Sequence, residues 1–291
     1  TRPSATRLMM KNGKIMMSAE CPDKTLISEI FLKNGINQIG FCRFSDILPL
    51  IQCRAVSRLP ESPETVIMCC FPYFVRKEKD RNLSYYACVR DYHDVAGKIL
   101  GTISEQLKNT FPDYNFPFFA DNSPVREVYA GLISGLGKRG MNGLLINEKY
   151  GSFVFLGEIV TDMKILCEKG EIKDCLRCRQ CIKNCPSGAL GEEGVDAEIC
   201  LSAVTQKKKT LSEHETDLIR KSGIAWGCDV CQTSCPMNRN VESTDIAEFI
   251  ESTDYFLKSD EVHDKINGRA YAWRGEKVIK RNLEILGGKT I

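Results

Sequence analysis

Apolar side chains recur at helical spacing in four parts of the sequence. In residues 89–111 they follow steps of three and four, which predicts a long amphipathic helix. Residues 24–34, 125–134 and 271–286 show shorter patterns of the same kind and predict three further helices, the last of them packed at the end of the chain.

Runs of β-branched and aromatic residues predict the strands. Residues 36–44 and 64–73 are such runs between turn residues, which is typical of buried strands. Residues 115–120 predict another strand, and residues 143–159 predict two strands joined by a turn near positions 149–151. We therefore expect an α+β fold whose first part mixes helices and strands.

Changes in residue composition and hydrophobic pattern along the chain predict its domains. Mixed helix and strand patterns fill residues 21–165, cysteine-rich loops fill residues 166–240, and helical patterning returns in residues 241–291. Residues 1–20 carry basic residues but lack the apolar core of a secretory signal. Because the sequence begins with Thr, we interpret this segment as a tail outside the fold, processed or added to the natural chain.

Composition and charge narrow the class of protein. The 291 residues are 43% hydrophobic and 27% charged, as in ordinary globular proteins. The net charge of +2 gives no global reason to bind nucleic acid, and the basic run at residues 207–209 is more often a solvated face. The longest apolar stretch, residues 65–75, is shorter than the ~20 residues that span a bilayer. We expect no membrane helix and a cytoplasmic protein.

Fifteen cysteines without a secretory signal favour metal ligation over disulfide bonds. Eight of them lie between positions 175 and 235. The other seven are scattered without ligand spacing, and we expect them to be small buried apolar side chains. These seven are Cys21, Cys42, Cys53, Cys69, Cys70, Cys88 and Cys167.

The cysteine spacing predicts two four-iron, four-sulfur clusters. Residues 175–186 have the bacterial ferredoxin spacing Cys-x2-Cys-x2-Cys-x3-Cys-Pro, and residues 228–236 repeat its second half with Ala225 in place of the first cysteine. Cys200 is the only cysteine between the two runs and can supply the missing ligand. We assign one cluster to Cys175, Cys178, Cys181 and Cys235, and the other to Cys185, Cys200, Cys228 and Cys231. Two structural zinc sites are the alternative, but zinc sites usually pair separated Cys-x2-Cys knuckles.

Several short motifs precede and accompany the cysteine runs. They read RDYH at 90–93, DNSP at 121–124, GLGKRG at 135–140, GSFVFLGE at 151–158 and GCDVCQ at 227–232. In this order they resemble the epoxyqueuosine reductase family over roughly residues 24–240. The resemblance implies a nitroreductase-like α/β domain that holds cobalamin, followed by a ferredoxin-like double-cluster domain. It also implies a ferredoxin or flavodoxin as electron donor, and reduction of epoxyqueuosine in a tRNA anticodon to an alkene with loss of water.

The resemblance also suggests roles for single residues. Asp121 corresponds to the family's proposed general acid, a role that requires desolvation to raise its pKa. The alternative is a carboxylate that caps the helix beginning near Val125. Tyr92 and His93 match an element near the family's active site, although one packed aromatic and one solvated imidazole on a helix turn would look the same.

Three glycines match a segment where backbone approaches the cofactor. They are Gly135, Gly137 and Gly140, and a helix-to-strand turn is the alternative explanation. The sequence departs from the family pattern at residues 138–141, at Glu127-Val128 where the family has Glu-Arg, and at its end, where we expect a short form without the helical-repeat tail. Two rival hypotheses follow: a cobalamin-dependent reductase of a small molecule, similar to reductive dehalogenases, or a non-catalytic electron-transfer protein.

Overall fold

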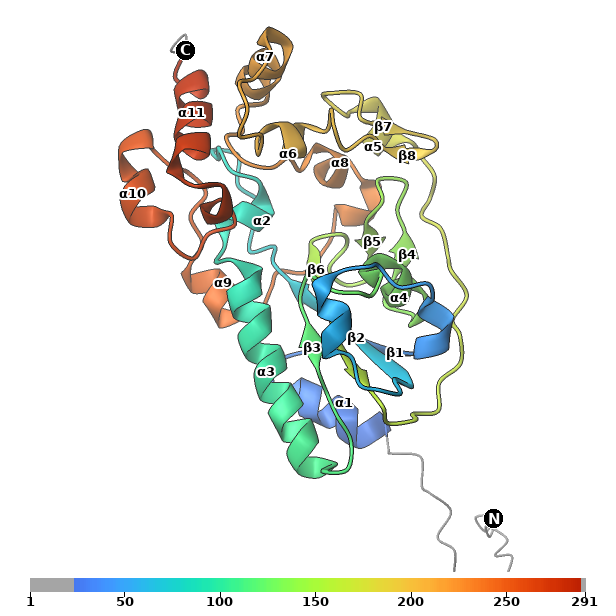
Figure 1. Cartoon of the computed structure of the whole chain (residues 1–291). Helices are drawn as coiled ribbons and strands as arrows, with labels where there is room; N and C mark the ends of the chain where they lie inside the picture. The colour runs from blue at the N-terminus through green and yellow to red at the C-terminus, as the bar shows by residue number, and fades with distance from the viewer. Residues whose placement is uncertain (1–23, 289–291) are drawn as a thin grey trace, which may run out of the picture.

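The computed structural model of the chain describes residues 24–288, and its centre is a four-stranded antiparallel sheet (Figure 1). The strand order is β1-β2-β6-β3. The strands are β1 (Ile39–Arg43), β2 (Thr65–Pro72), β3 (Phe118–Phe119) and β6 (Val154–Thr161). The expected tail at residues 1–20 and Cys21 lie outside the described residues.

Strand β2 is buried along its whole length because helices cover both faces of the sheet. Its side chains alternate between two hydrophobic clusters, with Ile67 and Phe71 in one and Val66 and Met68 in the other. Helices α1 (Lys24–Lys33) and α3 (Tyr92–Thr110) pack on the first face, and α4 (Glu127–Ile133) packs on the second. This arrangement brings the ends of α3, β3 and α4 near one another.

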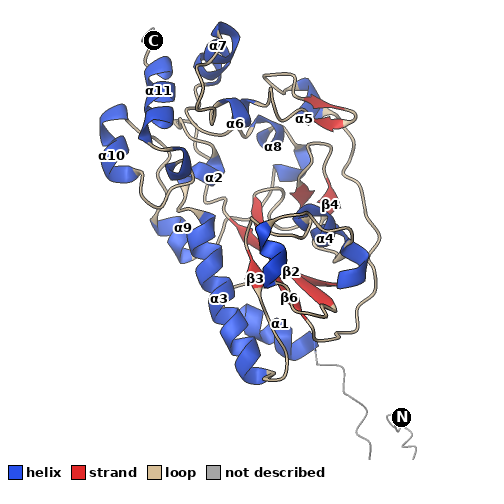
Figure 2. Ribbon diagram, in the orientation of Figure 1, coloured by secondary structure: helices blue, strands red, loops and turns tan. Residues whose placement is uncertain are grey.

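Short helices and hairpins surround the sheet, and loops connect most of them (Figure 2). They are α2 (Tyr85–Cys88), β4 (Lys138–Arg139), β5 (Leu145–Ile146), α5 (Gln180–Lys183), β7 (Leu190–Gly191), β8 (Gly194–Val195), α6 (Leu201–Val204), α7 (Glu213–Ser222), α8 (Val230–Thr233), α9 (Ala247–Glu251), α10 (Val262–Lys265) and α11 (Glu276–Leu286). Trp226 and Phe249 belong to the same hydrophobic cluster as Phe31 and Phe71. The three predicted segments therefore share one core.

The α+β fold is confirmed, and several predicted boundaries were wrong. Helix α3 begins at Tyr92 rather than position 89, because the Asp91 side chain accepts a hydrogen bond from the His93 backbone N–H and caps the helix there. The last helix begins at Glu276, after Gly275 with a φ of 82°. The strand expected at 115–120 is reduced to β3, and β5 pairs with β4 instead of β6.

The scattered cysteines are mostly buried, as predicted. Cys42, Cys69, Cys70, Cys88 and Cys167 are buried, whereas Cys53 is only half-buried. Over the part of the chain that the structure describes, every helix is too short or too polar to cross a lipid bilayer.

Candidate active site and cluster sites

His93 and Asp121, which lie 28 positions apart in the sequence, meet through their side chains. The Nε2 atom of His93 lies 3.2 Å from Oδ2 of Asp121, and its Nδ1 atom lies 2.7 Å from Oδ1 of Asp91. Helix α3 presents His93 in its first turn, and Asp121 lies two residues after the end of strand β3. An imidazole between two carboxylates is stabilised in its charged form.

These contacts shift the pKa values of His93 and Asp121. Hydrogen bonding to Asp121 and then to Asp91 raises the pKa of His93 to about 10. The hydrogen bond from His93 lowers the pKa of Asp121. The expectation that burial raises the pKa of Asp121 is therefore wrong for this structure: the carboxylate is ionised, and the proton resides on His93.

Tyr92 is held against the sheet beside this pair. Its ring stacks on Phe155 of β6, with centroids 4.2 Å apart and planes 11° apart. Burial and then the negative charge of Asp121 raise the pKa of its phenol. Tyr92 is thus a packed aromatic, as the alternative interpretation held, but His93 is not simply solvated, because it bonds Asp121.

The loop that carries Asp121 has an uncommon backbone. Asp121 and Asn122 have φ values of 55° and 47°, in the left-handed region that non-glycine residues seldom adopt. The alternative role of Asp121 as a helix cap is wrong, because Arg126 is the N-cap residue of α4 and no side chain caps it. Ser123 turns the loop by accepting the backbone N–H of Val125 at 2.9 Å.

Two further carboxyls lie behind this loop, and the sequence motifs gave them no role in the site. The Oε1 atom of Glu127 accepts the backbone N–H of Asp121 at 3.1 Å, and Glu158 of β6 accepts the Ser123 hydroxyl. Burial and then the Asp121 charge raise the pKa of Glu127 to about 7, and burial raises that of Glu158 well above its usual range. A single acid inside the apolar run of residues 154–161 is the sequence signal that could have identified Glu158.

A cavity of about 670 Å³ opens beside Asp121, Asn122 and Glu127. Arg139 and Val128 line both this cavity and a second one of about 370 Å³, so the two cavities lie next to each other. The wall of the second cavity includes Cys175. A ligand that fills both cavities would reach from Asp121 to the cysteine-rich segment.

The three predicted glycines have different environments. Gly135, with a φ of 84°, follows α4, and a Cβ on Gly137 would lie 2.5 Å from the carbonyl oxygen of Ile146. Both glycines are explained by the turn from α4 to β4 and its packing. Only Gly140 lines the second cavity, so the structure brings one of the three to a position where a ligand can meet its backbone.

The eight clustered cysteines surround two separate hollows. One hollow is lined by Cys175, Cys178, Cys181 and Cys235. The other, about 330 Å³ in volume, is lined by Cys185, Cys200, Cys228 and Cys231. This grouping places Cys200 beside the second run. Four thiolates around each hollow are the donor set of a four-iron, four-sulfur cluster.

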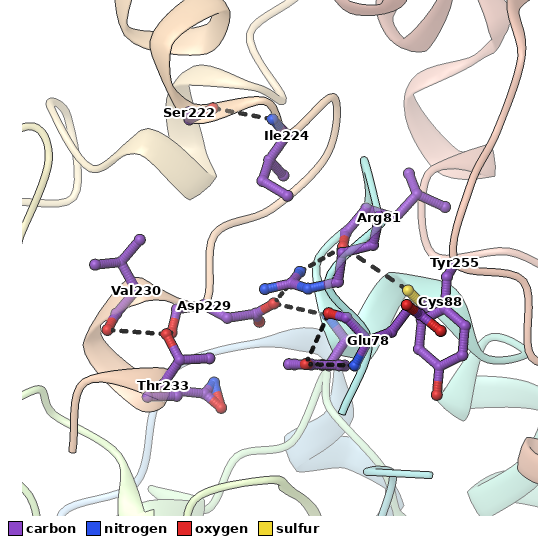
Figure 3. Close-up of polar contacts among 12 residues, drawn as sticks. Glu78, Arg81, Cys88, Ser222, Ile224, Asp229, Val230, Thr233 and Tyr255 are labelled. Atoms are coloured by element: carbon purple, nitrogen blue, oxygen red, sulfur yellow. Dashed lines mark hydrogen bonds and ion pairs between the residues drawn. The ribbon is translucent and has the colours of Figure 1, made fainter. Parts of the chain in front are cut away.

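Asp229, next to Cys228, ties the cysteine-rich segment to the α/β part (Figure 3). Its Oδ2 atom lies 2.7 Å from Nη1 of Arg81 and accepts the backbone N–H of Tyr85 at 2.8 Å. Gln232 of α8 reinforces the joint, since its side chain lies 3.0 Å from the hydroxyl of Tyr73. The GCDVCQ motif therefore combines cysteines with residues that hold them against the sheet.

Comparison with known proteins places this architecture in a family. Residues 54–122 match the family model described as epoxyqueuosine reductase QueG, and residues 174–238 match a 4Fe-4S double cluster binding domain. An epoxyqueuosine reductase from Synechocystis is 32% identical over 203 residues, which are 67% of this chain and 70% of that protein. The chain belongs to the epoxyqueuosine reductase family. Its double-cluster segment binds two 4Fe-4S clusters, so the zinc alternative is wrong.

Solved structures of this family share the fold. Epoxyqueuosine reductase from Streptococcus thermophilus aligns with a TM-score of 0.73 and 24% identity, over 90% of this chain and 80% of that one. A family structure with an epoxyqueuosine-modified tRNA-Tyr stem loop aligns with the same TM-score and 22% identity, over 90% and 80% of the two chains. The chain spans 57% of the curated relative from Lactococcus garvieae, which is 32% identical over 66% of this chain.

Proposed function

We propose that this protein is an iron-sulfur and cobalamin-dependent reductase that converts epoxyqueuosine in tRNA to queuosine. The observation that carries the proposal is the contact of His93 with Asp121 beside a cavity that adjoins a second one lined by Cys175. This arrangement joins a proton-holding pair to an electron-carrying segment. Reductive cleavage of a carbon-oxygen bond needs both.

The residues of the two adjoining cavities fit a large cofactor such as cobalamin. Gly140 and Gly143 line the second cavity, Gly143 with an exposed backbone, and the guanidinium groups of Arg126 and Arg139 offer donors to carboxamide oxygens at the first. Cys175 in the wall would put the cofactor next to a cluster. When bound, cobalamin supplies strongly reducing cobalt for attack on a carbon-oxygen bond, and the protein supplies position and electrostatics.

The chain's own residues would handle the proton and keep its donor in place. His93 holds a proton 3.2 Å from Asp121, whose carboxylate can pass it to a leaving oxygen in the cavity. Stacking of Tyr92 on Phe155 fixes the first turn of α3 and hence the direction of the imidazole. The proposed general acid is therefore a coupled pair and not a lone carboxylic acid.

We also propose that an acidic ferredoxin or flavodoxin delivers electrons where the first thiol set reaches the surface. Cys178 is exposed, and the neighbouring Leu176 is 67% exposed. Arg177 and Arg179 flank Cys178 in the sequence and Lys183 ends α5 (Figure 1); all three are exposed, and the two arginines also pair with Asp174 and Glu192. A small apolar contact with a basic rim suits an acidic partner that binds transiently. Charge complementarity raises the association rate of such a complex without requiring high affinity.

A basic groove between α7 and α11 supports tRNA as the substrate carrier. Lys207 is paired with Glu215, but its neighbours line a cavity of about 570 Å³ with other cations. The basic residues of this groove are Lys208, Lys209, Arg220, Lys277 and Arg281, and the acids Glu213 and Asp217 also line it. Such a row can contact backbone phosphates. Reversing Lys208 and Lys209 to Glu should raise KM for tRNA with little change in kcat.

The test is direct. Protein purified without oxygen is loaded with cobalamin and incubated with epoxyqueuosine-containing tRNA and a low-potential reductant, and the digested nucleosides are analysed. Formation of queuosine is expected. Bound cobalamin without queuosine, together with dehalogenation of a halogenated phenol, would favour the small-molecule reductase. Failure to bind any corrinoid would favour the electron-transfer protein.

A further inference from the structure

The proposed reaction consumes two protons, and the His93–Asp121 pair holds one. Removal of the epoxide oxygen breaks two carbon-oxygen bonds, forms a carbon-carbon double bond and releases water, so two electrons enter from the reductant and two protons are added to the oxygen. After the imidazolium proton of His93 has left through Asp121, a second proton is still required. A neutral acid in the same cavity would supply it.

Glu127 lies where such an acid is needed. It begins α4 and lines the 670 Å³ cavity together with Asp121. Its Oε1 atom accepts the Asp121 backbone N–H at 3.1 Å, which fixes the carboxyl against the loop. The second carboxyl oxygen is not used in this hydrogen bond and can carry a proton.

Glu158 provides a second carboxyl behind the same loop. It is fully buried on β6, opposite Phe119 of β3, and its Oε1 atom accepts the hydroxyl of Ser123. Its Oε2 atom is buried and has no hydrogen-bond partner among the described residues. Two carboxyls in so little water cannot both ionise cheaply, because each negative charge opposes the other. Glu158 therefore stays protonated under neutral conditions, and Glu127, whose pKa is raised to about 7, is protonated in part.

We propose that Glu127 is the second proton donor of this site, delivering its proton to the leaving oxygen after the His93–Asp121 pair has delivered the first. The inference rests on the proposed function, because the demand for a second proton comes from that reaction. It differs from a purely structural role, in which the Glu127 carboxyl would only hold the backbone of Asp121. The two roles are separable, since an amide oxygen can accept the same backbone hydrogen bond.

The charged groups around Glu127 suit this role. Burial and then the negative charge of Asp121 raise its pKa to about 7, while the positive charge of His93 acts in the opposite direction. Its own charge raises the pKa values of Glu158, Tyr92 and the Cys69 thiol. An acid that titrates near the working pH is a good donor and is easily reprotonated from solvent.

The deciding variant is Glu127→Gln, which keeps an oxygen for the Asp121 N–H but carries no transferable proton. The expected kcat with epoxyqueuosine tRNA falls about 100-fold, the lower range for loss of a general acid. KM should change by less than about twofold. The wild type should lose kcat above pH 7, and this loss should be absent in the variant. Glu127→Asp, which keeps a carboxyl, should recover part of the rate. Glu248→Gln, which removes a surface partner of Lys98, is the matched control.

A second readout does not need turnover. In ¹³C NMR of the cobalamin-free protein, one glutamate signal should titrate near pH 7, vanish in Glu127→Gln and move to lower pH in Asp121→Asn. A Glu127 signal that titrates near pH 4.5 would overturn the inference. So would a folded Glu127→Gln with wild-type kcat and pH profile, while leaving the proposed function intact. A wild type that binds cobalamin but makes no queuosine would overturn both.

Discussion

Arg81 and Asp229 form an ion pair across the junction between the α/β part and the cysteine-rich segment. Nη1 of Arg81 lies 2.7 Å from Oδ2 of Asp229, whose side chain is 0% exposed. The Arg81 guanidinium also donates to the carbonyl oxygen of Leu83 at 2.6 Å and lies over the ring of Tyr85. This buried ion pair thus holds the cysteine run of residues 228–236 against α2, next to the cluster sites to which the run contributes thiols.

Replacing Arg81 with Met should destabilise the protein by about 3–5 kcal/mol, because the Asp229 carboxylate would stay buried without its partner. Denaturant unfolding of the cluster-loaded protein measures the loss. Arg90→Met, which breaks an exposed pair with Asp94, is the control and should cost about 1 kcal/mol or less. Equal losses in the two variants would show that the buried pair has no special role.

Cys200→Ser should lower the iron content from about eight to about four atoms per chain, because this residue completes only the second set of thiols. Cys53→Ser changes a cysteine outside both hollows and should retain about eight. Iron analysis and electron paramagnetic resonance of the reduced proteins distinguish these outcomes. Full iron occupancy in Cys200→Ser would remove Cys200 from the proposed ligands.

His93 should remain protonated well above neutral pH, since its contacts with Asp121 and Asp91 raise its pKa to about 10. In Asp121→Asn the first of these contacts loses its charge, so the pKa of His93 should fall toward its usual value near 6.5. Imidazole ¹⁵N NMR across the pH range measures the shift. Asp174→Asn, which alters a carboxylate paired with Arg139, should leave the His93 titration unchanged.

The double variant Arg177→Glu and Arg179→Glu should slow electron transfer from reduced flavodoxin about tenfold and weaken its salt dependence, because charge complementarity acts mainly on association. Stopped-flow mixing under anaerobic conditions provides the rates. Iron content and reduction by dithionite should stay normal. Lys33→Glu on α1, at the opposite end of the molecule (Figure 1), should leave the rate unchanged.

Protein stability should fall as pH rises from about 4.5 to about 7, in part because of Glu127. Its pKa is raised by folding, so in this interval the folded state binds more protons than the unfolded state, and deprotonation favours unfolding. In Glu127→Gln this part of the decline should be absent. Urea unfolding at several pH values in this interval measures the difference between the variant and the wild type. The same slope in both proteins would contradict the assignment.

The sequence alone determined the features that depend on local spacing. Cysteines separated by two or three residues before Pro186 and Pro236 favour a four-iron, four-sulfur cluster over a zinc site, and apolar steps of three and four in residues 89–111 can bury one face only as a helix. The order of the short motifs also indicated the family. The assignment of Cys200 to the same cluster as Cys228 and Cys231 agrees with the hollow that these residues line together.

Tertiary structure decided what depends on distance across the chain. The contact of His93 with Asp121 joins the start of α3 to the end of β3, and it reversed the expected direction of the Asp121 pKa. The carboxyls of Glu127 and Glu158 come together only because α4 covers the face of the sheet that β6 crosses. Electrostatic effects on a pKa weaken with distance, so they depend on which charges the fold brings close together. A local sequence pattern does not predict those neighbours.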